Sequence, residues 1–195
     1  MPLAPLAALA RRLEAASYGT IIWDVADLPA QSREETGSLI LHVLRALTRK
    51  TRCVGLPLGG NDNAQGVAQA MLWQSGWPGR LSFATGMPMH DPWVYDAERL
   101  LRDGEVDVLL WVAAFGTEPP PATRVPTIAV LPPDVSPPAP AAVEIRIGVP
   151  GLDHRGWVMR SDTVVALPLA QTRAAPLPSV AAVAAAIGER LGTRP

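Results

Sequence analysis

The sequence predicts an α/β fold: a Rossmann-like, mainly parallel sheet covered by helices, followed by a C-terminal β-hairpin and helix. Two observations predict it. The strand segments are almost continuously apolar, which is typical of parallel strands buried on both faces. They alternate with segments whose apolar residues recur at helical spacing. The chain has 195 residues, 48% of them hydrophobic, so we expect a single α/β domain over residues 1–195.

The first third of the chain begins the alternation. Residues 3–16 carry one apolar stripe and are expected to form a helix. A short buried strand is expected at 19–25. The S-x-x-E spacing of residues 32–35 predicts a capping box at the start of the next helix. In that motif, Ser32 and Glu35 would satisfy free main-chain amides.

The remaining elements follow the same alternation. Strands are expected at 52–58, 106–114, 126–132 and 143–149, and helices from 64 onward, at 96–104 and at 178–192. Nine of the 21 prolines lie between 119 and 140, so the region of about 117–140 is expected to be loops around a strand. Apolar runs on both sides of Ser161-Asp162 predict a β-hairpin at 156–169.

Composition excludes several classes of function. A net charge of −1 gives no electrostatic attraction to nucleic acid or to an anionic membrane. The one cysteine, Cys53, excludes an intrachain disulfide and an iron–sulfur cluster held by this chain alone. We therefore expect a cytoplasmic protein. We expect no signal peptide, because the N-terminus lacks a leading positive region and Arg11 and Arg12 follow its apolar stretch. We expect no membrane span, because no apolar run approaches 18 residues.

The segment LPLGGNDNAQG, residues 56–66, resembles a phosphate cradle, because glycines follow a strand and precede a helix. Its spacing matches neither a dinucleotide fingerprint nor a P-loop, and the segment has no basic residue. The carboxylate of Asp62 would compete with an anion for the same amides. We therefore favour a turn at Gly59-Gly60 and a helix N-cap supplied by Asn61, Asp62 or Asn63 over a nucleotide site.

Two histidine–aspartate pairs are the remaining candidates for chemistry. His90-Asp91 and Asp153-His154 each supply two potential metal ligands, whereas a metal site needs three or four. We therefore interpret both pairs as loop residues, His42 as structural and Cys53 as part of the core. No metal site is expected.

Aromatic and methionine residues gather in one glycine- and proline-rich part of the chain. Six tryptophans are many for this length, and Trp, Met and Arg are enriched at protein interfaces. Burial at the ends of the sheet would explain the same residues equally well. The interface candidates are Trp73, Trp77, Met87, Met89, His90 and Trp93.

The stretch GGNDNAQGVAQAMLWQSGWPGRLSFATGMPMHDPWVYDAERLLRDGEVDVLLWVAA, residues 59–114, resembles the molybdenum/tungsten-pterin (B-type) subunit of formylmethanofuran dehydrogenases. The likeness lies in the Asn- and Gly-containing loop, the W-Q-x-G-x-P element, the G-x-P turn, and an acidic helix ending in GEVD before an apolar strand. The segment GWVMRSDTVVALPL, residues 156–169, resembles a later part of that family. The resemblance extends over about residues 19–170.

Departures from the family pattern shape what the resemblance implies. The family's clustered cysteines and its metal-ligating cysteine or selenocysteine have no counterpart here. The chain is therefore most similar to the truncated, cofactor-less B-type subunit of the bacterial formyltransferase/hydrolase complex of methylotrophs. That complex moves a formyl group from tetrahydromethanopterin to a methanofuran-type carrier and releases formate.

The resemblance implies a structural role in one-carbon metabolism and formaldehyde oxidation. Chemistry would belong to a formyltransferase subunit and a metal-dependent, amidohydrolase-like hydrolase subunit, and this chain would dock next to the latter. No catalytic residue, molybdopterin or iron–sulfur cluster is then expected here, and Gly59, Gly60, Asn61 and Asn63 would be a remnant loop.

Two alternatives remain open at the level of sequence. One is a pterin- or nucleotide-binding subunit of a formylmethanofuran dehydrogenase-like oxidoreductase, with its pocket at the remnant loop. The other is an independent α/β enzyme that uses His90 or His154.

Overall fold

The computed structural model describes residues 3–24, 27–29, 32–59, 62–116, 118–137 and 139–192. Contacts divide the chain into two compact units. Unit 1 comprises Met1–Gly60 with Ser161–Val164, and unit 2 comprises Asn61–Arg160 with Val165–Pro195. The two units are defined by their internal contacts and not by independent folding. The single domain expected over residues 1–195 therefore stays a prediction.

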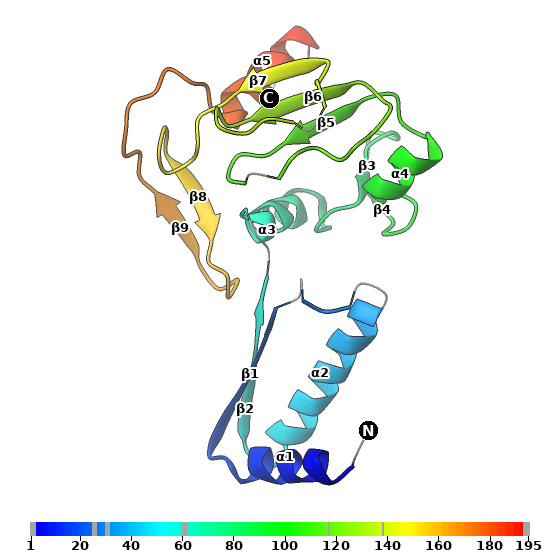
Figure 1. Ribbon diagram of the computed structural model, residues 1–195, viewed down its shortest axis with the longest axis vertical. Helices are drawn as coiled ribbons and strands as arrows, with labels where there is room; N and C mark the ends of the chain where they lie inside the picture. Colours follow the sequence, from blue (N-terminus) through cyan, green and yellow to red (C-terminus); the bar gives the residue numbers. More distant parts are fainter. Residues whose placement is uncertain are drawn as a thin grey trace. The chain divides into compact units, whose positions relative to one another are not determined.

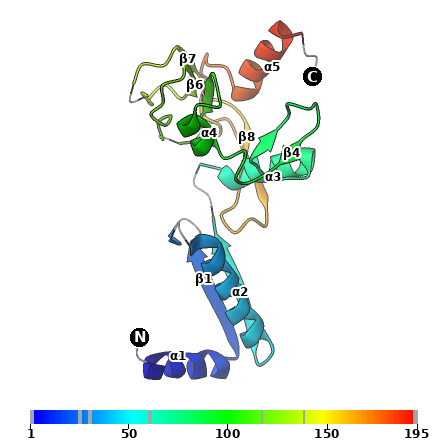
Figure 2. The same ribbon diagram turned by 90° about the vertical axis from the view of Figure 1, so that its right-hand side faces the viewer.

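Unit 1 is a two-stranded parallel sheet with helices. Its elements are α1 (Leu3–Ala15), β1 (Tyr18–Asp24), α2 (Arg33–Thr48) and β2 (Arg52–Leu58). α2 runs alongside β1 and β2 in both views (Figure 1 and Figure 2). The strands pair in parallel, with Tyr18 opposite Arg52 and Asp24 opposite Leu58. These elements confirm the predicted helix–strand–helix–strand order.

One face of this sheet is covered by α2. Gly55 lies where helix and strand approach most closely, because a Cβ atom at that position would lie 2.5 Å from Leu44 Cδ1 and 3.1 Å from the Trp23 ring. Cys53 is buried on this same face, as predicted. The side chain of Thr48 also donates to the Cys53 carbonyl at 3.2 Å.

The opposite face of the same sheet is exposed. Side chains alternate between faces along a strand, and the register places Tyr18, Thr20 and Ile22 of β1 beside Arg52, Val54 and Leu56 of β2. We call these six residues the outer face. Tyr18, Ile22 and Val54 are exposed there, Ile22 to 58%. An open apolar face is unusual for parallel strands.

Unit 2 is built around a three-stranded parallel sheet. Its strands are β5 (Leu109–Val112), β6 (Thr127–Leu131) and β7 (Val143–Arg146), in the order β5-β6-β7. The helices are α3 (Ala64–Ser75), α4 (Ala97–Asp103) and α5 (Val180–Arg190). Two antiparallel pairs complete it: β3 (Leu81–Ser82) with β4 (Met89–His90), and β8 (Gly156–Met159) with β9 (Ala166–Leu169).

The core of unit 2 lies along β6. Ala129 and Leu131 are fully buried and pack with Val135, with Trp111 of β5 against them. On the other face of the sheet, Leu110 of β5 remains exposed. β6 is therefore the middle strand of this sheet and also the most deeply buried of its three strands.

Two details differ from the sequence-based expectations. The capping box at 32–35 is wrong, because Ser32 is the N-cap residue of α2 but its side chain makes no capping hydrogen bond. Its hydroxyl lies 3.5 Å from Thr36 Oγ1 instead. The β3–β4 pair was not predicted. The α/β class, the parallel pairing, the C-terminal hairpin and the C-terminal helix are confirmed.

Candidate functional site

The loop that resembles a phosphate cradle joins the two units. Gly59 belongs to unit 1, and Asp62 and Asn63 belong to unit 2; Gly60 and Asn61 lie outside the described residues. Asp62 and Asn63 both have left-handed backbone conformations, with φ of 56° and 63°. Asn63 occupies the N-cap position of α3, as one of the predicted candidates, but its side chain makes no capping bond.

The Asn63 side chain binds the main chain of β8 instead. Its Nδ2 donates to the Trp157 carbonyl at 3.1 Å, and its Oδ1 accepts from the Met159 amide at 2.8 Å. Both ends of the amide are thus used to fix the start of α3 to the hairpin. Residue 66 must be small for this contact, because a Cβ atom on Gly66 would collide with the Asn63 amide oxygen.

Replacing Gly66 with alanine is therefore expected to destabilise the protein. In a helix interior this change normally stabilises by about 0.5–1 kcal/mol. Here the methyl group displaces Asn63, and the loss of two hydrogen bonds of about 1 kcal/mol each makes the net effect destabilising. Gly37→Ala in α2 is the matched control, because no atom lies within 4 Å of that position. Urea unfolding that gave equal stabilisation for both variants would contradict this assignment.

A cavity of about 910 Å³ lies beyond the carboxyl end of β5, where the N-terminal ends of α3 and α5 also meet. This is where open α/β sheets bind ligands. Its lining is largely apolar. The polar residues that line it are Asp62, Asn63, Glu118, His154, Arg155 and Ser179.

Four of the six polar residues that line this cavity are already in contact with other parts of the chain, which disfavours a phosphate cradle; Arg155 and Glu118 are the other two. The Asn63 amide is engaged by β8, and the Asp62 carboxylate is packed against Gly116. Ser179 caps α5 by accepting from the Ala182 amide at 3.2 Å. His154 Nδ1 lies 2.8 Å from the Arg155 carbonyl, and Nε2 lies 3.1 Å from the Gly148 carbonyl. Each nitrogen of that imidazole lies beside a main-chain carbonyl, and the tautomer determines which of them donates the hydrogen bond.

Asp153, the neighbour of His154, forms an ion pair with Arg173. The Asp153 residue is only 3% exposed, whereas the Arg173 side chain is 58% exposed. Asp153 accepts from Arg173 Nε at 2.5 Å and from the Val149 amide at 2.8 Å. The hydrogen bond from Arg173 and then that from Val149 hold the pKa of the carboxyl below its usual range. Sequence reasoning did not identify Arg173, because the two residues are 20 positions apart.

Acid is expected to weaken the fold through Asp153. Its pKa is lower in the folded chain than in the unfolded chain, where it is about 3.9, so the folded state binds fewer protons. The stabilisation is fully present above the unfolded pKa and is lost as the pH falls through the folded pKa. The urea midpoint should therefore fall below about pH 4. The difference in midpoint between the wild type and Asp153→Asn should shrink over that range, and a constant difference would contradict the pairing.

The predicted interface residues lie on α3 and on the segment 77–93 after it. Trp73, Trp77, Met87, Met89 and Trp93 are exposed, with Met87 at 71% and Trp93 at 80%. Phe83, which sequence reasoning missed, is exposed on the same hairpin as Met87 and Met89.

His90 and Trp73 differ from the other interface candidates in their local contacts. His90 is half-buried: its ring stacks on Trp77 with 4.8 Å between centroids, and its Nδ1 lies 2.7 Å from the Gly79 carbonyl. His90 is thus a structural support for this segment. Trp73 instead lines a groove beside β8 together with Trp157.

Metal-binding clusters and membrane helices are both absent from the described residues. No group of three or more His, Cys, Asp or Glu side chains in that part of the chain could hold a metal ion. No helix in the same part is long and apolar enough to cross a membrane.

Comparison with known proteins identifies two curated relatives. FhcB, of the formyltransferase/hydrolase complex of Methylorubrum extorquens, is 32% identical over 151 residues, covering 76% of this chain and 41% of that protein. The B-type subunit of the tungsten-containing formylmethanofuran dehydrogenase 2 of Methanocaldococcus jannaschii is 24% identical over 99 residues, covering 51% of this chain and 23% of that protein. No protein-family model matches the chain.

A solved structure agrees with the sequence relatives. A chain in the crystal structure of the formyltransferase/hydrolase complex FhcABCD from Methylorubrum extorquens, in complex with methylofuran, matches with a TM-score of 0.83 and 30% identity. The match covers 98% of this chain and 53% of that chain. The predicted resemblance and the α/β fold are confirmed, and this chain spans about half or less of the length of the relatives it matches.

Proposed function

We propose that this chain, a relative of FhcB, is a non-catalytic structural subunit of a formyltransferase/hydrolase complex. That complex moves a formyl group between tetrahydromethanopterin and a methanofuran-type carrier and releases formate. The similarity to a subunit of such a complex supports the proposal. The chain spans about half of that relative. The exposed surface of this chain therefore provides the second line of support.

Exposed apolar side chains within each unit are the observation that carries the proposal. In unit 1, Tyr18, Ile22 and Val54 are 56%, 58% and 41% exposed on the outer face of β1–β2. In unit 2, Leu110 and Val112 are 54% and 46% exposed on β5.

These side chains lie on strands of parallel sheets. The outer face of β1–β2 and Leu110 of β5 are exposed, although strands of parallel sheets are normally covered on both faces. Exposed apolar patches of this kind mark interaction surfaces. Other subunits of the complex, especially the amidohydrolase-like hydrolase subunit, would cover them. A cytoplasmic location, with neither nucleic acid nor membrane as a partner, is part of the proposal.

The loop at Gly59 and Asn63 is, in this proposal, a remnant that holds no pterin or nucleotide. The engagement of Asn63 by β8 and the acidic side chain of Asp62 support this. The cavity beside the loop favours the alternative, a pterin- or nucleotide-binding subunit. Pterin, molybdenum and tungsten analysis of the native preparation distinguishes the two: stoichiometric amounts bound to this chain would establish the alternative.

Omitting this chain from a co-expressed complex tests the structural role. We expect the remaining subunits to assemble poorly or to melt at lower temperature, while any transferase or hydrolase activity per assembled active site is unchanged. Restoring the chain should restore assembly. Equal assembly and thermal stability with and without this chain would contradict a structural role.

A further inference from the structure

The loop between β4 and α4 presents an exposed tryptophan. Trp93 is 80% exposed, the largest fraction among the large apolar side chains of the described residues. Tryptophan is rarely left in water to this extent, because its indole is well buried on average. A tryptophan in such a position needs either a mobile loop or a partner that covers it.

The backbone of this loop is held by hydrogen bonds on its inner side. The Oδ1 atom of Asp91 accepts from the amides of Trp93 and Val94, at 2.8 Å each. These two bonds lower the pKa of Asp91, with the bond from Val94 contributing more. Asp96 then caps α4 by accepting from the Arg99 amide at 3.0 Å. The loop therefore has a defined conformation at both ends.

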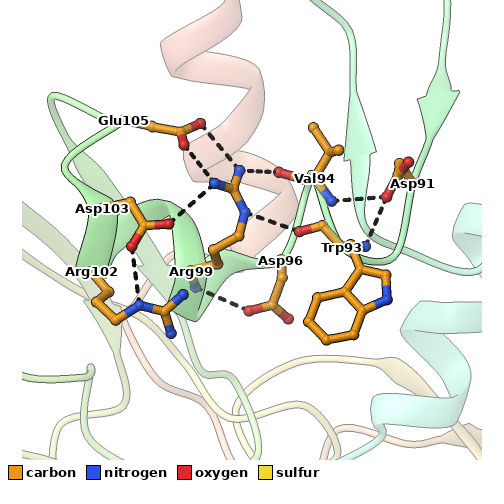
Figure 3. Close-up of polar contacts among 8 residues, drawn as sticks. All are labelled: Asp91, Trp93, Val94, Asp96, Arg99, Arg102, Asp103 and Glu105. Carbon is orange, nitrogen blue, oxygen red and sulfur yellow. Dashed lines mark hydrogen bonds and ion pairs between the residues drawn. The ribbon is translucent and has the colours of Figure 1, made fainter.

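The Arg99 guanidinium holds the two carbonyls of the same loop. Its Nε donates to the Trp93 carbonyl at 3.0 Å, and its Nη2 donates to the Val94 carbonyl at 2.5 Å. Glu105 accepts two further bonds, at 2.5 and 3.1 Å, and Asp103 one at 3.3 Å. The Trp93 indole projects away from this network (Figure 3). Arg99 is thus a positioning residue for an indole that it does not itself cover.

Charge around the loop indicates the kind of surface that Trp93 meets. Residues 91–105 contain five carboxylates and two arginines, a net charge of −3, which Arg80 offsets in part through its ion pair with Asp96 at 3.0 Å. An anionic lipid surface would be repelled by this segment. A protein pocket with an apolar floor and a basic rim would complement both the indole and the acidic residues around it. Tryptophan anchors in such pockets are typical of interface hot spots.

We propose that Trp93 is a pre-formed anchor that inserts into an apolar, basic-rimmed pocket on another subunit of the complex, with Arg99 and Asp91 holding the loop in its binding conformation. This inference rests on the proposed function. It adds that Trp93 makes the dominant contact and that the loop is held in order to present this side chain. An anchor held before association loses little conformational freedom on binding, which strengthens the complex.

Site-specific cross-linking in the native complex tests the anchor directly. The photoreactive residue benzoylphenylalanine replaces Trp93 in one variant and Trp157, which is 65% exposed on β8, in the matched control. We expect residue 93 to cross-link to a peptide of a different subunit that contains apolar residues next to Lys or Arg. Cross-links from 93 only to a second copy of this chain, or no cross-link, would overturn the proposal.

The purification step of the same experiment keeps the two proposals distinguishable. If the tagged chain co-purifies with transferase and hydrolase subunits but residue 93 captures neither, the anchor fails and the proposed function stands. If the chain elutes alone, both fail. A separate assay mixes the purified chain with phosphatidylcholine–phosphatidylglycerol vesicles and follows tryptophan fluorescence. Binding with a blue shift that is lost in Trp93→Phe would show that Trp93 meets a membrane, and would overturn the protein pocket.

Affinity measurements distinguish the role of Trp93 as the anchor from the role of Arg99 as the residue that positions it. Trp93→Ala is expected to weaken association with the other subunits by about 30-fold or more, as hot-spot truncations do. Arg99→Ala should weaken it by about 5-fold, and should add little in the Trp93→Ala background, because coupled residues are non-additive. Arg102→Ala is the matched control, since Arg102 pairs with Asp103 and is not bonded to the loop carbonyls. Additive effects of Trp93→Ala and Arg99→Ala would overturn the positioning role.

Discussion

Replacing Ile22 with aspartate is expected to remove this chain from its complex while leaving its own fold intact. Ile22 is exposed at the carboxyl end of the outer face of β1–β2, so its loss changes the stability of the isolated chain by only about 0.5 kcal/mol. In an assembly that covers this face, the carboxylate would be buried without a partner. That costs several kcal/mol, equivalent to at least about a 100-fold loss of affinity.

Co-purification with tagged partner subunits measures this effect. Leu191→Asp is the comparison, because Leu191 is an even more exposed apolar residue, at 74%, just beyond α5 and is not part of a sheet face. We expect complex recovery to be lost with Ile22→Asp and retained with Leu191→Asp. Circular dichroism of both isolated variants confirms that they fold. Full recovery of the complex with Ile22→Asp would mean that the outer face stays exposed in the assembly.

Replacing Leu131 with alanine is expected to cause the largest loss of stability. Leu131 is 1% exposed at the end of β6 and packs with Ala129 and Val135 in the core of unit 2. Truncating a fully buried leucine removes its transfer free energy and leaves a cavity, which together cost about 3 kcal/mol.

Urea unfolding followed by tryptophan fluorescence provides the measurement. Leu110→Ala is the matched control, because Leu110 lies on the neighbouring strand, β5, but is exposed. We expect its free energy of unfolding to change by less than about 1 kcal/mol. Equal effects of the two substitutions would mean that the core does not lie along β6.

Periodicity predicted the regular elements well because it depends on local sequence. The strand over 52–58 is observed as predicted, and the helix expected at 96–104 is α4 with Asp96 as its N-cap. The pair β3–β4 was missed because two strands of two residues each are too short to alternate visibly. The Ser32 capping box failed because the spacing of residue types does not determine the backbone angles that a cap requires.

The candidate site was less predictable because its contacts are distant in sequence. Asn63 binds residues 157 and 159, and Asp153 binds Arg173; no short motif signals either contact. Arg99 was also missed, although Trp93 was identified from composition. The signal for Arg99 is weak: an arginine at the start of an acidic helix, six residues after an exposed aromatic side chain.

Native mass spectrometry of the tagged chain, purified gently from its own cells, tests the central claim most directly. We predict an assembly that contains this chain together with separate transferase and hydrolase subunits in fixed stoichiometry, since the exposed apolar faces of its sheets must be covered. A stable species of 20.7 kDa or a simple multiple of that mass, with no other subunit, would contradict it.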